Sequence, residues 1–156
     1  MISIAAEQDG RLIQSITANT SVFTTEEVDC VAELWDEYCQ QGAQVSGYYF
    51  VVEREDERVR GFACYGPRSL TVGTYDLFWI AVDSECRRAG VGRLLLDWVE
   101  EDIHRMGGRL IVVETSGLEK YAPTRRFYLA TGYLLEATLK DFYKDGDDLV
   151  IFTKHL

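Results

Sequence analysis

A basic, glycine-containing segment within residues 80–96 has the residue types most suited to chemistry. It runs from an apolar strand into the start of an apolar helix. Glycines let a backbone approach a ligand closely, and the unpaired amides at a helix start carry the positive end of the helix dipole. The glycines and the arginines that add positive charge are Arg87, Arg88, Gly90, Gly92 and Arg93. The pattern predicts an anion-binding loop.

Two other phosphate-binding motifs do not fit this loop. A dinucleotide fingerprint needs a third glycine where this chain has Leu95, and a P-loop needs a lysine followed by Ser or Thr. Two glycines also suit an ordinary tight turn whose arginines are solvated. The loop alone does not decide between a turn and a ligand site.

The segment Arg87-Arg88-Ala89-Gly90-Val91-Gly92 resembles the R/Q-x-x-G-x-G/A pyrophosphate loop of the GNAT superfamily of N-acetyltransferases. In that family the loop joins the fourth strand to a helix. A fifth strand, a helix with a tyrosine, and a glycine–aromatic pair follow. Tyr128 and Gly132-Tyr133 supply the last two features here. The motifs match over residues 74–133, and the predicted order of elements extends the resemblance over most of the chain.

The resemblance implies where acetyl-CoA would bind. The backbone of Ile80, Ala81 and Val82 would bond the pantetheine arm, and the cofactor would lie where strands four and five splay apart. The residues implied to hold the pyrophosphate are Arg87, Arg88, Ala89, Gly90, Val91, Gly92 and Arg93. Thr124 and Phe127 complete the predicted cofactor contacts, although Thr124 also suits an ordinary helix position. No metal is predicted.

One position departs from the family pattern. Many members have an asparagine seven residues before the tyrosine, near the pantetheine, and this chain has Tyr121 there. That contact is therefore not carried over.

Acetyl transfer needs an acid that protonates the departing thiolate. The family position implies Tyr128, and a phenol of reference pKa about 10 can protonate a thiolate whose conjugate acid has a pKa of about 8.5, at least locally. A core tyrosine is the alternative, and a free thiolate can also leave unaided. Backbone amides around Ile80 and Ala81 would stabilise the oxyanion.

A base must also take a proton from an acceptor amine that is mostly ammonium at neutral pH. Asp76 is the first candidate, because it lies six residues before Val82, where some GNAT enzymes carry a catalytic glutamate, and an acid in so apolar a strand needs a reason. It could instead bind the ammonium or be a structural carboxylate. Glu114, on the fifth strand, is the second candidate, and Ser116 could line the same cleft.

The sequence predicts an N-acetyltransferase whose acceptor is a primary amine of a small molecule, an amino acid, or a peptide or protein. We expect acceptor specificity to come from residues 25–47 and 140–148. The acids of the second segment equally suit a solvated turn. A binding module that senses acyl-CoA without turnover is the alternative function, and an enzyme with a longer acyl donor is another.

Residue patterns predict the elements that must position this site. Thr24-x-x-Glu27 is typical of a capping box before a helix at 25–41. Strands are expected at 48–53 and 59–65 as a hairpin, and at 74–82. An amphipathic helix at 91–106, ended by Gly107-Gly108, follows the basic loop.

The remaining pattern gives a strand at 110–115, a helix from Pro123 to Gly132, and strands at 133–139 and 149–153, the last pairing within the chain or across a homodimer interface. Asp145-Gly146 is a strong turn signal, in a connection longer than two residues. The expected fold is a mixed α+β domain spanning 1–156, with a GNAT-like, mostly antiparallel, twisted sheet of six to seven strands flanked by helices.

Composition sets the remaining limits. With 156 residues, 47% of them hydrophobic, the chain suits one core, and no apolar run is long enough to span a membrane. A net charge of -10 disfavours nucleic acid and anionic membranes as partners. The four cysteines include no C-x-x-C pair, so we expect reduced thiols in a cytoplasmic protein.

Overall fold

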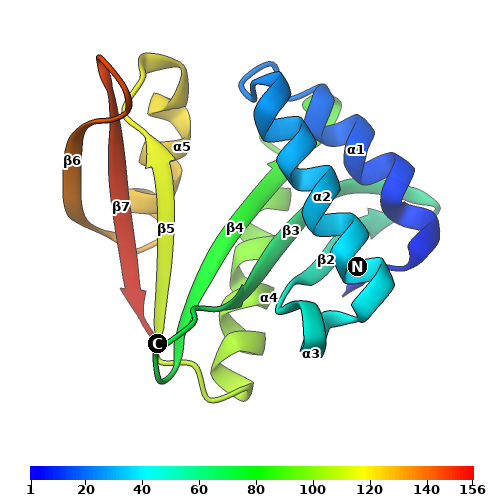
Figure 1. Cartoon of the computed structure of the whole chain (residues 1–156). Coiled ribbons are helices and arrows are strands. Elements are labelled where there is room, and N and C mark those ends of the chain that lie inside the picture. The colour runs from blue at the N-terminus through cyan, green and yellow to red at the C-terminus, as the bar shows by residue number, and fades with distance from the viewer. The chain divides into compact units, whose positions relative to one another are not determined.

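The computed structural model describes all 156 residues and contains seven strands in one sheet of order β1-β2-β3-β4-β5-β7-β6 (Figure 1). Four of its strand pairings are antiparallel and β4–β5 is parallel, which confirms the predicted α+β class and the mostly antiparallel sheet. The strands are β1 (Ile2–Ile4), β2 (Tyr49–Glu55), β3 (Arg58–Pro67), β4 (Thr74–Val82), β5 (Leu110–Ser116), β6 (Leu134–Lys144) and β7 (Asp147–His155).

Five α-helices and three short 3-10 turns complete the chain. The helices are α1 (Gly10–Ala18), α2 (Thr25–Gln41), α3 (Ala43–Ser46), α4 (Val91–Arg105) and α5 (Ala122–Ala130), and the turns are Glu7–Asp9, Ser84–Cys86 and Glu119–Tyr121. None of the helices is long and apolar enough to cross a membrane. The chain forms two compact units. The first is Met1–Gly66 with Phe78–Asp102, and the second is Pro67–Leu77 with Ile103–Leu156. The single domain spanning 1–156 stays a prediction.

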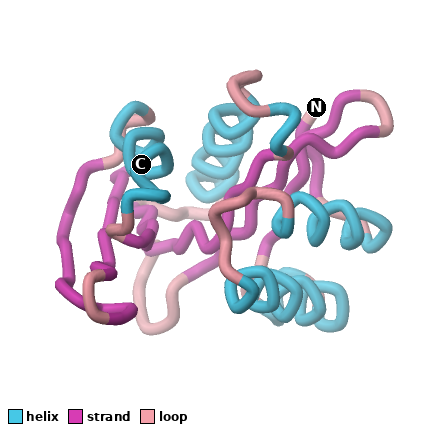
Figure 2. The backbone as a smooth tube through the Cα atoms, turned by 90° about the horizontal axis from the view of Figure 1, so that it is seen from above, coloured by secondary structure: helices cyan, strands magenta, loops and turns pink.

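The first unit is a β-layer between helices, as the view from above shows (Figure 2). Alternation along the β2–β3 hairpin sends Phe50, Val52 and Phe62 to the core that α1 and α2 cover. α4 belongs to the same unit and packs on β3 at Gly61. A Cβ added to Gly61 would lie only 3.0 Å from the Val91 side chain and 3.1 Å from the Leu95 side chain. A glycine at this point lets the helix approach the strand closely.

Helix α2 starts as the sequence predicts. The Thr24 hydroxyl accepts from the Glu27 amide at 3.2 Å, and the Glu27 carboxylate accepts from the Thr24 amide at 2.7 Å. This reciprocal pair satisfies two amides that a helix start leaves without partners, which fixes the boundary at Thr25.

The second unit joins β4 to β5 in parallel, with the register running from Thr74↔Leu110 to Asp76↔Val112. β7 lies between β5 and β6 and pairs antiparallel with both. Pro123 sits in the first turn of α5, as predicted, where its missing amide costs no hydrogen bond. α5 packs on the sheet through Tyr128, whose ring centroid is 5.7 Å from that of Phe152.

Two elements at the start of the chain were not predicted. β1 is only three residues long and extends the hairpin at Ile2↔Glu53. α1 has no side-chain cap, because the Asp9 carboxylate instead accepts from the Ala6 amide and pairs with Arg54. Neither element carries a local signal as strong as a capping box.

The predicted long connection over 140–148 is wrong. β6 continues to Lys144 and β7 begins at Asp147, so only Asp145 and Gly146 form the turn. Their charged neighbours look like a loop in sequence, but β6 is an edge strand and every residue of it is at least partly exposed, so charges are tolerated there. Asp141 has a φ of 53°, which marks an irregularity inside the strand.

Candidate active site

The predicted anion-binding loop leaves the end of β4 in the first unit. After the turn Ser84–Cys86, residues 87–90 are exposed and α4 begins at Val91. Gly90 has a φ of 77°, and its carbonyl accepts the amide of Leu94 at 3.0 Å. A left-handed backbone favours glycine, so conformation explains Gly90, while a Cβ there would meet nothing within 4 Å.

The first amides of α4 have no acceptor within the helix, which suits them to bind an anion. Gly92 and Arg93 lie in this first turn, and Arg88, with a φ of 66°, stands beside it. The exposed loop, the helix start and the basic side chains together fit a diphosphate.

Two of the three arginines in this region already have partners. Arg87 donates to the carbonyl oxygen of Thr20 at 2.5 Å, so it links the basic loop to the segment between α1 and α2. Arg93 donates to Asp97 one turn further along α4 at 2.8 Å. The Arg93–Asp97 pair is exposed, and an exposed ion pair contributes little to stability, so an anionic ligand can compete for Arg93.

The strand before the loop holds the residues predicted to contact pantetheine. Ala81 is buried, whereas Ile80 and Val82 are half-buried. A Cβ on Gly61 would come 2.8 Å from the Ala81 carbonyl, so β3 runs close to β4 here. Trp79, the residue before Ile80, packs edge-on against Phe23 with ring centroids 5.3 Å apart.

The two candidate carboxylates meet in the second unit. Asp76 is the last residue of the β4–β5 register, opposite Val112, and Glu114 lies two residues further along β5 on the same face. Arg68, between β3 and β4, bridges them: its Nε and NH2 atoms donate to Asp76 at 2.6–3.0 Å, and NH2 also donates to Glu114 Oε1 at 3.0 Å. These hydrogen bonds raise the pKa of Arg68, so it remains a cation.

The sequence reasoning missed Arg68. It lies eight residues before Asp76 and follows Pro67, with no motif around it. The available signal was the need for a cation beside a carboxylate in an apolar strand. Only the fold shows which arginine meets that need.

Tyr128 occupies an aromatic cluster on α5. Its side chain is 3% exposed, and its ring centroid lies 5.4 Å from Phe127, 5.5 Å from Tyr133 and 5.7 Å from Phe152. Burial raises the pKa of its phenol well above the ordinary value of 10.0, so the group is protonated throughout the physiological range. Thr124 and Phe127, on the same helix, are half-buried.

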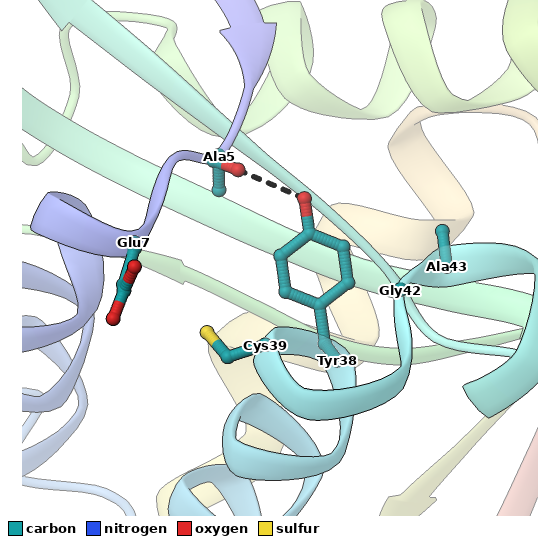
Figure 3. Close-up of a pocket in the computed structure, with 6 residues that line it drawn as sticks. All are labelled: Ala5, Glu7, Tyr38, Cys39, Gly42 and Ala43. Carbon is teal, nitrogen blue, oxygen red and sulfur yellow. Dashed lines mark hydrogen bonds between the residues drawn. The ribbon is translucent and has the colours of Figure 1, made fainter.

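A shallow pocket of about 270 Å³ lies elsewhere, in the first unit (Figure 3). The Tyr38 hydroxyl donates to the Ala5 carbonyl at 2.8 Å at its side, and Cys39 points toward Glu7. Burial raises the pKa of the Cys39 thiol, which keeps it from acting as a thiolate. The lining residues are Ala5, Glu7, Tyr38, Cys39, Gly42 and Ala43. Four of them lie in the segment 25–47 that is expected to give acceptor specificity, and none is a predicted catalytic residue or cofactor contact.

Comparison with known proteins bears on these features. The model of the acetyltransferase (GNAT) domain matches residues 45–134, which include the basic loop, both carboxylates and Tyr128. The chain belongs to the GNAT family of acetyltransferases. An uncharacterised N-acetyltransferase of Methanocaldococcus jannaschii is 32% identical over 106 residues, which cover 67% of this chain and 65% of that protein. The chain therefore matches slightly less than two thirds of that relative's length.

Solved structures agree with this assignment. A protein assigned to the GNAT family from Desulfovibrio desulfuricans is 46% identical, with a TM-score of 0.94 over 99% of both chains. The yncA protein of Salmonella typhimurium, solved with acetyl-CoA, has a TM-score of 0.76 at 20% identity, over 100% of this chain and 93% of that one. At that identity, the second likeness concerns the fold.

Proposed function

We propose that this protein transfers the acetyl group of acetyl-CoA to a primary amine by direct attack in a ternary complex. Membership of the GNAT family supports the reaction class. The observation that carries the proposal is the exposed basic loop at the start of α4, with its left-handed Gly90. That loop suits the pyrophosphate of a coenzyme A ester.

The proposed site divides its tasks among the residues already described. The pyrophosphate is held by the amides and side chains of residues 87–93, and the pantetheine arm by the backbone of residues 80–82. Thr124 and Phe127 stay predicted cofactor contacts. Acetyl-CoA supplies the thioester. The acceptor amine loses a proton to the carboxylate pair, and its nitrogen then attacks the thioester carbonyl.

Tyr128 is the proposed acid for the departing thiolate. Its raised pKa keeps the phenol protonated, so it can always donate. The same shift makes it a weaker acid, so the proton moves only after charge has developed on sulfur. Tyr128→Phe should lower kcat about 10-fold and leave acetyl-CoA affinity within about twofold, measured by thiol release and calorimetry.

Exposure and hydrogen bonding distinguish Asp76 from Glu114. Both oxygens of Asp76 accept from Arg68, and its side chain is 13% exposed. The Glu114 side chain is 42% exposed, and only its Oε1 is in the bridge. Geometry therefore favours Glu114 as the group that takes the proton, with Asp76 as its neighbour in the same network.

We expect the enzyme to act in the cytoplasm without a metal, either as one chain or as a homodimer. All four cysteines are free thiols in the structure, which suits a reducing compartment. The net charge of -10 favours an amine acceptor that is cationic before it reacts.

The test is calorimetric titration with acetyl-CoA, followed by thiol release across a panel of amines. Saturable binding and amine-dependent release of coenzyme A are expected. Binding without release would instead favour an acyl-CoA sensor, and absence of binding would reject the proposal. Gly90→Ala should weaken acetyl-CoA binding about tenfold because alanine is strained at a φ of 77°. Gly107→Ala, at a φ of 83° where an added Cβ also meets nothing within 4 Å, is the matched control outside the predicted site segments.

A further inference from the structure

Arg68 is held from two directions before it reaches the carboxylates. Its backbone amide donates to the Thr74 carbonyl at 2.9 Å, and its own carbonyl accepts from the Thr71 hydroxyl at 2.7 Å. The guanidinium then grips Asp76 through Nε and NH2. With its backbone held and its planar guanidinium bonded to Asp76 along one edge, Arg68 has little freedom left to rotate.

The remaining bond of Arg68 goes to one oxygen of Glu114. NH2 meets Oε1 at 3.0 Å, while the structure gives Oε2 no hydrogen bond. The Glu114 side chain is 42% exposed, so Oε2 is accessible. A carboxylate held by one oxygen and open at the other has a set orientation and a free acceptor.

The net charge of the Asp76–Arg68–Glu114 network also suits an ammonium acceptor. Two carboxylates close together repel, and one arginine between them removes the repulsion and leaves one net negative charge. That charge matches a single ammonium group, which is the form in which an acceptor amine arrives at neutral pH.

We propose that Arg68 is a positioning residue that orients Glu114 so that its Oε2 accepts the proton of the acceptor ammonium, with Asp76 anchoring Arg68. This inference rests on the proposed acetyl transfer. A first proton leaves nitrogen for Oε2, and the freed lone pair forms the N–C bond. The nitrogen of the resulting adduct loses its second proton to water, and the C–S bond breaks. Tyr128 protonates the thiolate and recovers its proton from water, and Glu114 releases its proton to solvent.

A double-mutant cycle on kcat tests the inference, with Arg68→Gln, Glu114→Gln and the double variant. Each single change should lower kcat at saturating amine by about 30-fold or more, as expected for loss of a general base. In the Glu114→Gln background, Arg68→Gln should lower kcat by less than about a further threefold, because a residue that acts only through Glu114 then has no carboxylate to orient. The KM for acetyl-CoA should stay within about twofold in all three.

Two controls separate positioning from folding. Arg68→Lys keeps the charge but loses the planar fork, so it should recover part of the kcat lost in Arg68→Gln. Arg60→Gln removes an arginine that also bridges two carboxylates, Glu53 and Glu55, and should leave kcat per folded molecule unchanged.

The outcomes are distinct. If the loss of kcat in the double variant equals the product of the two single losses while the wild type turns over normally, the positioning role of Arg68 is overturned and the proposed function stands. Wild-type protein that binds acetyl-CoA but releases no thiol with any amine would overturn the proposed function and, with it, this inference. Non-additive losses with partial rescue by lysine would support it.

Discussion

The molecule contains two arginine bridges of the same construction in different surroundings. In the first unit, Arg60 donates to both oxygens of Glu53 and to Glu55. In the second unit, Arg68 donates to both oxygens of Asp76 and to Glu114. Arg60 therefore holds one carboxylate with two bonds and Arg68 holds one with three, and each arginine donates a single bond to a second carboxylate.

Exposure separates the two bridges. The Glu53 side chain is 2% exposed and also accepts from the amino group of Met1, so all its bonds serve the β1–β3 region. The hydrogen bond from Arg60, more than any other contact, lowers the pKa of Glu53, although burial opposes the shift. Arg68 and Glu114 are each 42% exposed and border solvent. The same chemistry holds a hairpin in one place and presents a carboxylate in the other.

The largest expected difference is in kcat, between variants of Glu114 and Glu55, the carboxylates that each accept a single bond from their arginine. Glu114→Gln should lower kcat about 100-fold, because it removes the proposed proton acceptor. Glu55→Gln, its counterpart in the Arg60 bridge, should leave kcat within about twofold. Thiol release at saturating amine measures both. Equal effects in the two variants would remove the functional distinction between the bridges.

A smaller and opposite difference is expected in stability. Arg60→Gln leaves the buried Glu53 carboxylate short of its main partner, which should lower the Tm by about 10 °C. Arg68→Gln should lower it by only about 3 °C, since Glu114 is 42% exposed and Asp76, at 13%, is less deeply buried than Glu53 at 2%. Circular dichroism melts at pH 7 compare the two. A larger drop for Arg68→Gln would assign it a structural role instead.

The smallest expected effect is a pH dependence. Because the folded pKa of Glu53 lies below its ordinary value of 4.5, its contribution is present above that pH and is lost as the pH falls through the folded value. Wild-type Tm should therefore fall by about 3 °C more than that of Arg60→Gln between pH 6 and pH 3. Melts of Glu55→Gln provide the reference. Parallel curves for wild type and Arg60→Gln would contradict this account of Glu53.

Much of the fold was predictable because its signals are local. The Thr24–Glu27 box fixed α2, and Pro123 marked α5. The loop at Gly90 was predictable because its glycines and arginines are neighbours in the sequence. By contrast, β1 takes its place only by pairing with β2, 47 residues or more away, and leaves little trace in its own three residues.

The candidate site likewise has one part with a local sequence signal and one part without. The residues of the proposed pyrophosphate loop are consecutive, so the sequence motif includes all of them. The Arg68 bridge joins positions that are up to 46 residues apart in the chain, and its donor has no motif. The family resemblance suggested Asp76, and a place on the fifth strand suggested Glu114 separately, but only the parallel register of β4 and β5 brings them to one arginine.

The place of β6 in the sheet has a consequence during synthesis. Its only neighbour is β7, which follows it in the chain, and Leu134, Leu135 and Phe142 stay more than half exposed even after pairing. At roughly 5–20 residues per second, the ribosome needs about a second to add β7. Until then a strand with exposed apolar side chains has both edges open, so crowded polysomes and rapid overexpression are the conditions in which this chain should be most prone to aggregate.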